Sequence, residues 1–379
     1  MDWHSTAWCE RRIRRRIAAY DPDVIVSVHP AMNYAPMIST RKLSGASGKH
    51  IPFFTVVTDL GSGHCTWFQK SVDKLYVASE RLYKLAKRRG RTPDENIVMT
   101  GLPIRHDFAL EAQAMGDRRS NHGKAYQKDM KLKLGINPDK PMILLMGGGE
   151  GVGSLSSIVD ELYTSLVQHG VDATVCVICG RNAKLQANLK DRDWQSVLTK
   201  ERKVSKRKRI LSKIPFLGGR RRSREIQASI DRGEAQEDDP HMRDGDVDVV
   251  GLGFITNMAE YMVAADVLVT KAGPGTIAEA ASLGLPIMLT SFLPGQEAGN
   301  VDFVLEKGFG DYCENPIAIG REVTYWLQDK EILEVMSEKA QEAGHPDAAA
   351  EIVKDIGSIA HTWMALNGPN SQSLSTLSI

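Results

Sequence analysis

The sequence predicts an α/β fold built from two halves, and three stretches of the chain are the basis of this prediction. In residues 266–290, an apolar run, a Gly-Pro-Gly turn, a helical pattern and a second apolar run follow one another, which indicates a strand–helix–strand unit. Residues 142–168 repeat the order of strand, glycine-rich loop and helix. In residues 21–60, two β-branched runs each end in a polar loop, which is typical of strands in such a sheet.

The composition is that of a protein with about two folded domains. The chain has 379 residues, of which 42% are hydrophobic and 25% charged. Its formal net charge of +1 gives no general attraction for nucleic acid, so we expect no nucleic-acid partner. Five scattered cysteines argue against a disulfide framework, and no run of 18 apolar residues predicts a membrane span. Because Cys176 and Cys179 are three apart in an apolar strand, we expect buried thiols on opposite faces, not a metal or redox pair.

The first half is predicted to hold four strands whose polar loops gather at one edge. The expected strands span 21–30, 51–60, 74–78 and 96–100, and the expected helices span 7–20 and 79–90, with Ser79 as cap and Gly90 as stop. If this sheet is parallel, one edge carries His29, Thr58, Asp59, His64 and Trp67. The plainer interpretation makes each of them a hydrogen-bonded loop residue. Residues 111–133 fit a linker or a surface helix.

The second half is predicted to begin with a phosphate-binding loop. Strand 142–146 is followed by GGGEGVGS and then by a helix, so backbone amides at the helix start are available to an anion. The loop lacks the lysine of GxxxxGK[ST], which disfavours a Walker-type nucleotide hydrolase. The next strands are expected at 173–179, which ends in Gly180, Arg181 and Asn182, and at 247–255.

The unit at 266–290 is predicted to bind the rest of a nucleotide. Gly273 and Gly275 allow a sharp turn, Pro274 suits the first helical position, and Thr276 is expected to cap the helix. One turn later, the carboxylate of Glu279 is placed to accept hydrogen bonds from ribose hydroxyls. The alternative is a simple turn followed by a solvated glutamate.

Polar and charged residues fill the remaining stretches of the second half. Gln296, Glu297 and Asn300 follow the strand that ends this unit and suit hydroxyl recognition. Residues 200–224 hold twelve Lys/Arg and residues 231–248 hold eight Asp/Glu, which predicts a charged insertion at about 196–246. The insertion is expected to be a disordered loop, and the alternative is a foothold on anionic lipid. Helices are expected at 316–328, 329–343 and 346–364, before a disordered tail at 365–379.

Seven motifs of the chain together resemble the monogalactosyldiacylglycerol synthase family, a family 28 glycosyltransferase of plastid envelopes. They are PDVIVSVHP (22–30), VVTDL (56–60), LLMGGGEG (144–151), ICGRN (178–182), GFITNMAE (253–260), TKAGPGTIAEA (270–280) and GLPIMLTSFLPGQEAGN (284–300). The resemblance covers about residues 10–364 except the insertion. It implies a GT-B fold, in which two Rossmann-like domains face a cleft. It also implies a peripheral enzyme of the plastid envelope membrane that moves galactose from UDP-galactose to 1,2-diacylglycerol with inversion.

The resemblance also assigns roles to single residues. It places the diphosphate at Gly147, Gly148, Gly149, Glu150, Gly151, Gly273, Pro274, Gly275 and Thr276. It places the uracil between Phe254 and Ile255, the ribose at Glu279, and the sugar hydroxyls at Glu297 and Asn300, beside Gln296. Arg181 and Lys271 would stabilise the leaving diphosphate, so that no metal ion and no other cofactor is needed. The candidates for the catalytic base are His29 and Asp59.

The resemblance predicts an acceptor domain at 1–135, a donor domain at 136–345 and a C-terminal helix at 346–364. The family's N-terminal glycine-rich segment with its histidine has no counterpart here, so we expect a truncated, incomplete first domain whose sheet has an unpaired apolar edge. We therefore expect a chain that binds UDP and transfers galactose poorly or not at all. The alternatives are a GT-B epimerase of UDP-sugars and a non-catalytic protein that binds UDP-sugar or lipid.

Overall fold

The structure is a computed structural model that describes residues 2–147, 152–199 and 243–367. Four glycine-loop residues of the predicted diphosphate site, at positions 148–151, therefore lie outside the described residues. The basic stretch 200–224, a predicted alternative contact with anionic lipid, also lies outside the described residues.

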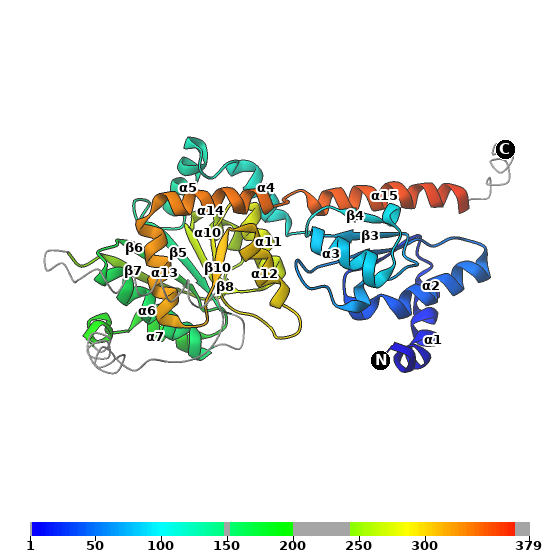
Figure 1. The fold of residues 1–379 in the computed structure, drawn as a ribbon, viewed down its shortest axis with the longest axis horizontal. Coiled ribbons are helices and arrows are strands. Elements are labelled where there is room, and N and C mark those ends of the chain that lie inside the picture. Colours follow the sequence, from blue (N-terminus) through cyan, green and yellow to red (C-terminus); the bar gives the residue numbers. More distant parts are fainter. Residues whose placement is uncertain (1, 148–151, 200–242, 368–379) are drawn as a thin grey trace.

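The described chain forms two parallel sheets, one in each half, and the two halves lie side by side (Figure 1). In the described residues the first sheet has the order β1-β2-β3-β4, and the second has the order β10-β9-β8-β5-β6-β7. The first sheet comprises β1 (Ile25–Ser27), β2 (Phe53–Val56), β3 (Lys74–Val77) and β4 (Ile97–Met99). The second comprises β5 (Met142–Met146), β6 (Ala173–Ile178), β7 (Val247–Leu252), β8 (Val267–Lys271), β9 (Ile287–Ser291) and β10 (Gly310–Tyr312). All pairings are parallel, which confirms the predicted α/β class.

Helices cover both sheets and connect their strands. In the first half they are α1 (Asp2–Tyr20), α2 (Tyr34–Ser47) and α3 (Glu80–Leu85). Helices α4 (His106–Met115) and α5 (Asn121–Lys133) lead to the second half. There follow α6 (Val152–Gln168), α7 (Ala183–Lys190), α10 (Met258–Ala264), α11 (Pro274–Ser282), α12 (Ala298–Lys307), α13 (Pro316–Gln328), α14 (Lys330–Ala343) and α15 (Ala348–Asn367).

The central strands of the second sheet are apolar on both faces because helices bury both. Cys176 packs into the hydrophobic cluster on one face, whereas Cys179 packs into the cluster on the other. Burial raises the pKa of the Cys176 thiol to about 12, which keeps it protonated at neutral pH. The prediction of two buried thiols on opposite faces is confirmed.

Three predicted elements differ from the structure. The sequence prediction missed α2, because this helix buries the small polar residues Ser39 and Thr40 and so lacks an apolar period. Residues 111–133 hold the end of α4 and all of α5, so of the two predicted alternatives the helix and not the linker is found, with two helices in place of one. Ser120 caps α5 by accepting from the amide of Gly123. The helix predicted at 79–90 is capped by Ser79 as expected, but its last turn, from Ala86 to Gly90, is a π-helix.

The outer edge of the first sheet is open. Strand β1 pairs with β2, and among the described residues no strand pairs with its other side. Val26 and Val28 are exposed there. The predicted unpaired apolar edge is thus present in the described part of the chain.

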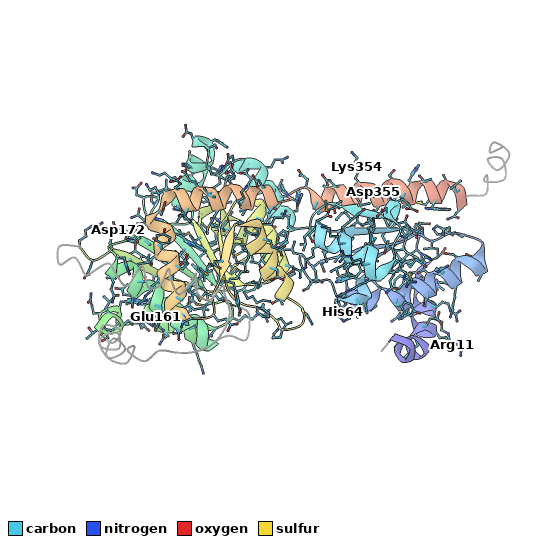
Figure 2. The ribbon with its side chains drawn as sticks, in the orientation of Figure 1. Arg11, His64, Glu161, Asp172, Lys354 and Asp355 are labelled. Atoms are coloured by element: carbon cyan, nitrogen blue, oxygen red, sulfur yellow. The ribbon has the colours of Figure 1, made fainter. Side chains whose placement is uncertain are left out.

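The C-terminal helix α15 crosses back from the second half and covers the first sheet (Figure 1). Its Ile352 packs with Phe54 and Tyr76, and the Tyr76 hydroxyl donates a hydrogen bond to Asp355, which Figure 2 labels on this helix. The helix was predicted to end at residue 364, but it continues to Asn367, whose amide donates to the carbonyl oxygen of His50 at 2.8 Å. Helix α15, which follows the second half in the chain, therefore packs as part of the first half.

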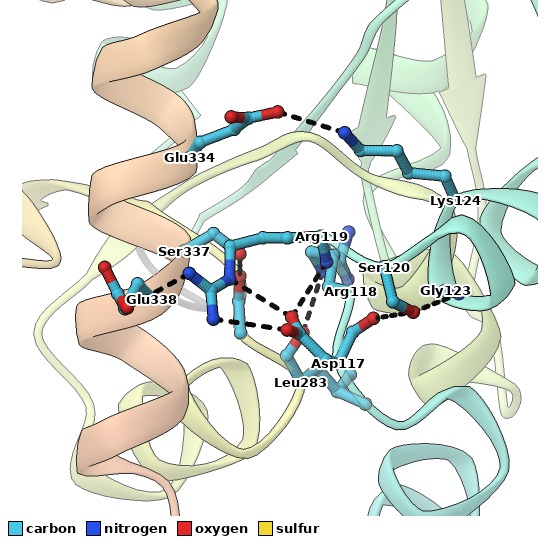
Figure 3. A network of polar contacts seen from close by, with 11 residues as sticks. Asp117, Arg118, Arg119, Ser120, Gly123, Lys124, Leu283, Glu334, Ser337 and Glu338 are labelled. Atoms are coloured by element: carbon cyan, nitrogen blue, oxygen red, sulfur yellow. Dashed lines mark hydrogen bonds and ion pairs between the residues drawn. The ribbon is translucent and has the colours of Figure 1, made fainter.

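A buried arginine joins three segments of the second half (Figure 3). The guanidinium of Arg118 donates to the carbonyl oxygens of Leu283, Ala265 and Met262 at 2.7, 2.6 and 2.9 Å. These carbonyls lie at the ends of α10 and α11, where helical partners are missing. Arg118 thus fixes the helices that flank the predicted nucleotide site.

Candidate active site

The two halves meet where the loop after β2 touches the start of α12. A Cβ atom on Gly61 would lie 1.6 Å from the carbonyl oxygen of Gly299, so only glycine fits this contact. Beside it, the Ser62 hydroxyl donates to the carbonyl oxygen of Gln296 at 2.7 Å and accepts from the amide of Gly299 at 3.3 Å. Because parallel strands present their carboxyl ends at one edge, these contacts bring the ligand-bearing edges of both sheets together.

Asp59 lies in this loop, two residues before the glycine contact. Its carboxylate accepts a hydrogen bond from the indole N–H of Trp67 at 2.8 Å, and Trp67 is 1% exposed. Burial raises the pKa of Asp59 above its ordinary value, the Trp67 bond opposes this, and the charge of Glu297 raises it further. Asp59 therefore belongs to the first half, and its pKa is affected by a charge of the second half, that of Glu297.

The neighbouring loops of the first half are joined by a residue that sequence reasoning missed. The fully buried Asn33 accepts from the Thr55 hydroxyl at 3.1 Å and donates to the carbonyl oxygen of Thr66 at 3.3 Å. It thereby links the loop after β1 to the loop after β2. No apolar period or motif marks a buried asparagine in the sequence.

The two histidines of this edge are both exposed. His29 accepts from the amide of Ala31 at 3.2 Å through Nδ1, so it caps its own turn. His64 uses Nδ1 in the same way, with the hydroxyl of Thr66 at 2.7 Å, and Figure 2 labels it on the first half. The charge of His64 also lowers the pKa of Asp59. Of the two predicted base candidates, Asp59 is the one that the structure places beside the second half.

The second half places an ion pair opposite Asp59. The Lys271 ammonium, at the end of β8, donates to the carboxylate of Glu297 at 2.7 Å. Glu297 is 8% exposed, and its other oxygen accepts from the amide of Leu293 at 2.7 Å. This pair holds a cation at the carboxyl edge of the sheet, where the sequence predicts the departing diphosphate.

Helix α11 begins beside Lys271, as predicted, with Pro274 as its first residue. Its N-cap is Gly273, however, and no side chain caps it. Thr276 lies inside the first turn, so the expectation that it caps the helix was wrong by three positions. The first amides of α11 therefore have no side-chain cap, which is the usual arrangement where a helix start binds an anion.

Glu279 is paired with an arginine that the sequence prediction missed. Its carboxylate accepts from Nε and Nη2 of Arg105 at 2.7 and 3.0 Å, and it is 7% exposed. Arg105 lies in the crossing between the halves and rests on the ring of Phe108 at 4.6 Å. A carboxylate has about four acceptor positions, so two remain for hydroxyl groups. The role of Glu279 at a ribose stays a prediction.

The remaining predicted donor residues lie on loops after the strands of the second sheet. Gly147 follows β5, Arg181 is exposed after β6, and Phe254 is 70% exposed after β7. Ile255 packs against the core, and Gln296 is exposed before α12. The structure thus gathers this set at one edge, and the individual contacts stay predictions.

Asn300 belongs to the predicted donor set, but its side chain is used within the protein. Its side chain is 0% exposed, and both of its polar atoms are hydrogen-bonded to backbone groups of the two halves. Its predicted contact with a sugar hydroxyl is untested.

Replacing Glu279 by alanine should weaken UDP binding. Loss of a charge-assisted bond to a ribose hydroxyl is expected to cost about 1.5 to 3 kcal/mol. Isothermal titration calorimetry with UDP measures the change, and Asp302→Ala, which removes an exposed carboxylate of α12, is the control. An unchanged affinity in Glu279→Ala would leave Glu279 as the partner of Arg105 alone.

The described residues contain no group of three or more His, Cys, Asp or Glu side chains that could hold a metal ion. The expectation of metal-independent catalysis is not tested by this and stays a prediction. The described helices also include none long and apolar enough to cross a bilayer.

Two protein-family models match the chain. The monogalactosyldiacylglycerol (MGDG) synthase model matches residues 4–104, and the glycosyltransferase family 28 C-terminal domain matches residues 202–352. The monogalactosyldiacylglycerol synthase of Spinacia oleracea is 34% identical over 357 residues, which cover 93% of this chain and 56% of that protein. Monogalactosyldiacylglycerol synthase 1 of Arabidopsis thaliana is 34% identical over 358 residues, covering 93% and 54%. The chain thus spans about half the length of the curated relatives it matches.

The fold has a counterpart among solved structures. MurG of Acinetobacter baumannii aligns with a TM-score of 0.57 at 15% identity and covers 94% of this chain and 81% of its own. That likeness concerns the fold alone, and it agrees with the GT-B architecture of two facing parallel sheets. The first half of the chain is thus similar to the monogalactosyldiacylglycerol synthase model, the second half to the C-terminal domain of family 28 glycosyltransferases, and nearly the whole chain to plant monogalactosyldiacylglycerol synthases.

Proposed function

We propose that this chain transfers galactose from UDP-galactose to the free hydroxyl of 1,2-diacylglycerol, with inversion at the anomeric carbon. The observation that carries the proposal is the position of Asp59, which lies two residues before the contact of Gly61 with Gly299 and whose pKa is raised by burial and by the charge of Glu297. The similarity to monogalactosyldiacylglycerol synthases supports the choice of reaction, of sugar donor and of lipid acceptor.

In the proposed reaction, Asp59 accepts the proton of the diacylglycerol hydroxyl while that oxygen attacks the anomeric carbon. The bond between this carbon and the diphosphate oxygen breaks, and UDP leaves. Lys271 and Arg181, together with the amides at the start of α11, stabilise the charge that develops on the diphosphate. These cations support our proposal that transfer needs no metal ion.

The dependence of the rate on pH should report the raised pKa of Asp59. The base acts only when deprotonated, so a raised pKa moves the acidic limb of kcat/KM to higher pH than an ordinary aspartate gives. Trp67→Phe removes a hydrogen bond that lowers this pKa, so its limb should lie at still higher pH. Rate profiles of both proteins test this, and a limb that moves to lower pH in Trp67→Phe would contradict it.

We also propose that the chain acts as a peripheral protein on anionic membrane, at the plastid envelope. The relatives are named as chloroplastic enzymes, and the acceptor is a lipid. Helix α1 carries exposed arginines that pair with no described carboxylate, namely Arg11, Arg12, Arg15 and Arg16. Figure 2 labels Arg11 on the same side of the first half as His64, which supports an orientation with this side toward the lipid.

Replacing these four arginines by glutamine should weaken binding to phosphatidylglycerol vesicles. Each basic residue near such a surface contributes about 1 kcal/mol, and salt screens the attraction. Vesicle co-sedimentation at two salt concentrations measures the loss. The double variant Lys124→Gln/Lys128→Gln, on α5, is the control because both lysines are paired with carboxylates. Equal binding of the four-arginine variant and the unaltered protein would remove α1 from the membrane contact.

One incubation tests the function. The protein, in excess over labelled UDP-galactose, is incubated with that donor and with diacylglycerol vesicles. Labelled galactolipid supports the proposal. An epimerised UDP-sugar, or bound and unchanged UDP-galactose, would replace it by one of the two alternative functions.

A further inference from the structure

Asn300, like Ser62, is a side chain through which the two halves share hydrogen bonds at their glycine contact. Its Oδ1 accepts from the amides of Leu60 and Gly61, in the first half, at 3.2 and 3.3 Å. Its Nδ2 donates to the carbonyl oxygen of Ala272, in the second half, at 3.1 Å. The residue is 0% exposed, and its polar atoms have partners that a ligand would have to displace.

The backbone groups that Asn300 joins flank both predicted reaction partners. Leu60 directly follows Asp59, and Ala272 directly precedes Gly273, the N-cap of α11. The side-chain amide of Asn300 therefore bonds to one backbone group next to the proposed base and to another next to the proposed diphosphate site.

The surroundings require an amide at this position. A carboxamide supplies one acceptor for two backbone N–H groups and one donor for a carbonyl oxygen, whereas a carboxylate only accepts. A carboxylate would also add negative charge close to Asp59, whose pKa the charge of Glu297 already raises. Gly61 and Gly299 have no room for side chains of their own at this contact.

We propose that Asn300 is a positioning residue that fixes the Asp59 loop against the diphosphate loop. It acts through backbone amides and carbonyls and does not touch the sugar. Its effect on rate rests on the proposed transfer function, whereas the clamp itself can be measured without any reaction. The prediction from family resemblance that Asn300 holds a sugar hydroxyl is the rival assignment.

Hydrogen exchange tests the clamp directly. In the unaltered protein, the amides of Leu60 and Gly61 should be protected, and in Asn300→Ala both should exchange faster, while peptides of β5 and β8 keep their protection. Unchanged exchange at Leu60 and Gly61 in Asn300→Ala would overturn the clamp. This result does not depend on whether galactose is transferred.

Kinetics and binding test the role. Asn300→Ala should lower kcat about 100-fold through misplacement of Asp59, while the affinities for UDP and for UDP-galactose both stay unchanged. A selective loss of affinity for UDP-galactose over UDP would overturn the proposal in favour of the sugar contact. If the unaltered protein transfers no galactose, the proposed function fails while the exchange experiment still decides on the clamp.

A second test variant and a control variant complete the experiment. Gly61→Ala adds a methyl group that Gly299 cannot accommodate, so it should separate the loops and reproduce the fall in kcat with UDP affinity intact. It replaces Asn300→Ala if that variant does not fold. Arg81→Ala removes an exposed ion pair to Asp302 that also joins the halves, and it should change neither exchange nor kcat. A normal kcat in Gly61→Ala, or an equal fall in Arg81→Ala, would contradict a specific clamp.

Discussion

Asp59→Asn should lower the rate of galactose transfer by about 100-fold to 10,000-fold, the contribution of a general base. Asparagine keeps the shape of the side chain and can still accept the indole N–H of Trp67, which lies 2.8 Å from the carboxylate. It cannot take a proton from the acceptor hydroxyl at neutral pH. Single-turnover measurements with labelled UDP-galactose give the rate, and calorimetry should find UDP binding unchanged because Asp59 lies in the other half.

His29→Gln is the comparison that separates the two candidate bases. His29 is exposed and its Nδ1 is engaged with the amide of Ala31, so its replacement should cause a much smaller fall in rate. A large fall in His29→Gln together with a small fall in Asp59→Asn would assign the base to His29.

Arg118→Met should lower the free energy of unfolding by about 3 kcal/mol or more. The arginine is buried, and its three carbonyl acceptors would lose a partner, each at a cost of about 1 to 3 kcal/mol. Gln127 still donates to one of them, the carbonyl oxygen of Ala265, so two are left without a side-chain donor. Burial lowers the pKa of Arg118 to about 10, so the three carbonyl bonds and not the charge itself are the expected source of the stability. Urea denaturation followed by circular dichroism measures the difference.

Arg119→Ala is the matched control. Arg119 is the next residue and pairs with Glu338 at 3.2 Å nearer the surface, where an ion pair contributes at most about 1 kcal/mol (Figure 3). If both variants lose the same small amount, Arg118 does not hold α10 and α11 in place.

Local patterns in the sequence predicted most of the elements of the fold. The unit at 266–290 appears as β8, α11 and β9, with Pro274 at the first helical position. The alternation of Cys176 and Cys179 also follows from strand geometry. The prediction missed α2, whose buried face carries serine and threonine. The helix α15 was predicted, but its packing against the first sheet was not. Contacts such as Tyr76–Asp355 join positions far apart in the chain and leave no local pattern.

The candidate site was predicted in part for the same reason. Loops at strand ends pointed to Asp59, Lys271 and Glu297, and the structure brings them to the junction of the halves. Arg105 and Asn33 were not predicted, since their importance comes from partners that only the folded chain supplies. Thr276 was misassigned because the helix begins at Pro274, which leaves the threonine inside the first turn.

The anomeric configuration of the galactolipid made by the unaltered protein tests the proposed mechanism most directly. A single displacement, with Asp59 as base on one face of the sugar and the diphosphate leaving from the other, converts the α-linked donor into a β-linked product. Proton NMR of the lipid product distinguishes the two anomers. We expect β-galactosyl diacylglycerol, and an α-linked product would contradict direct displacement by the acceptor hydroxyl.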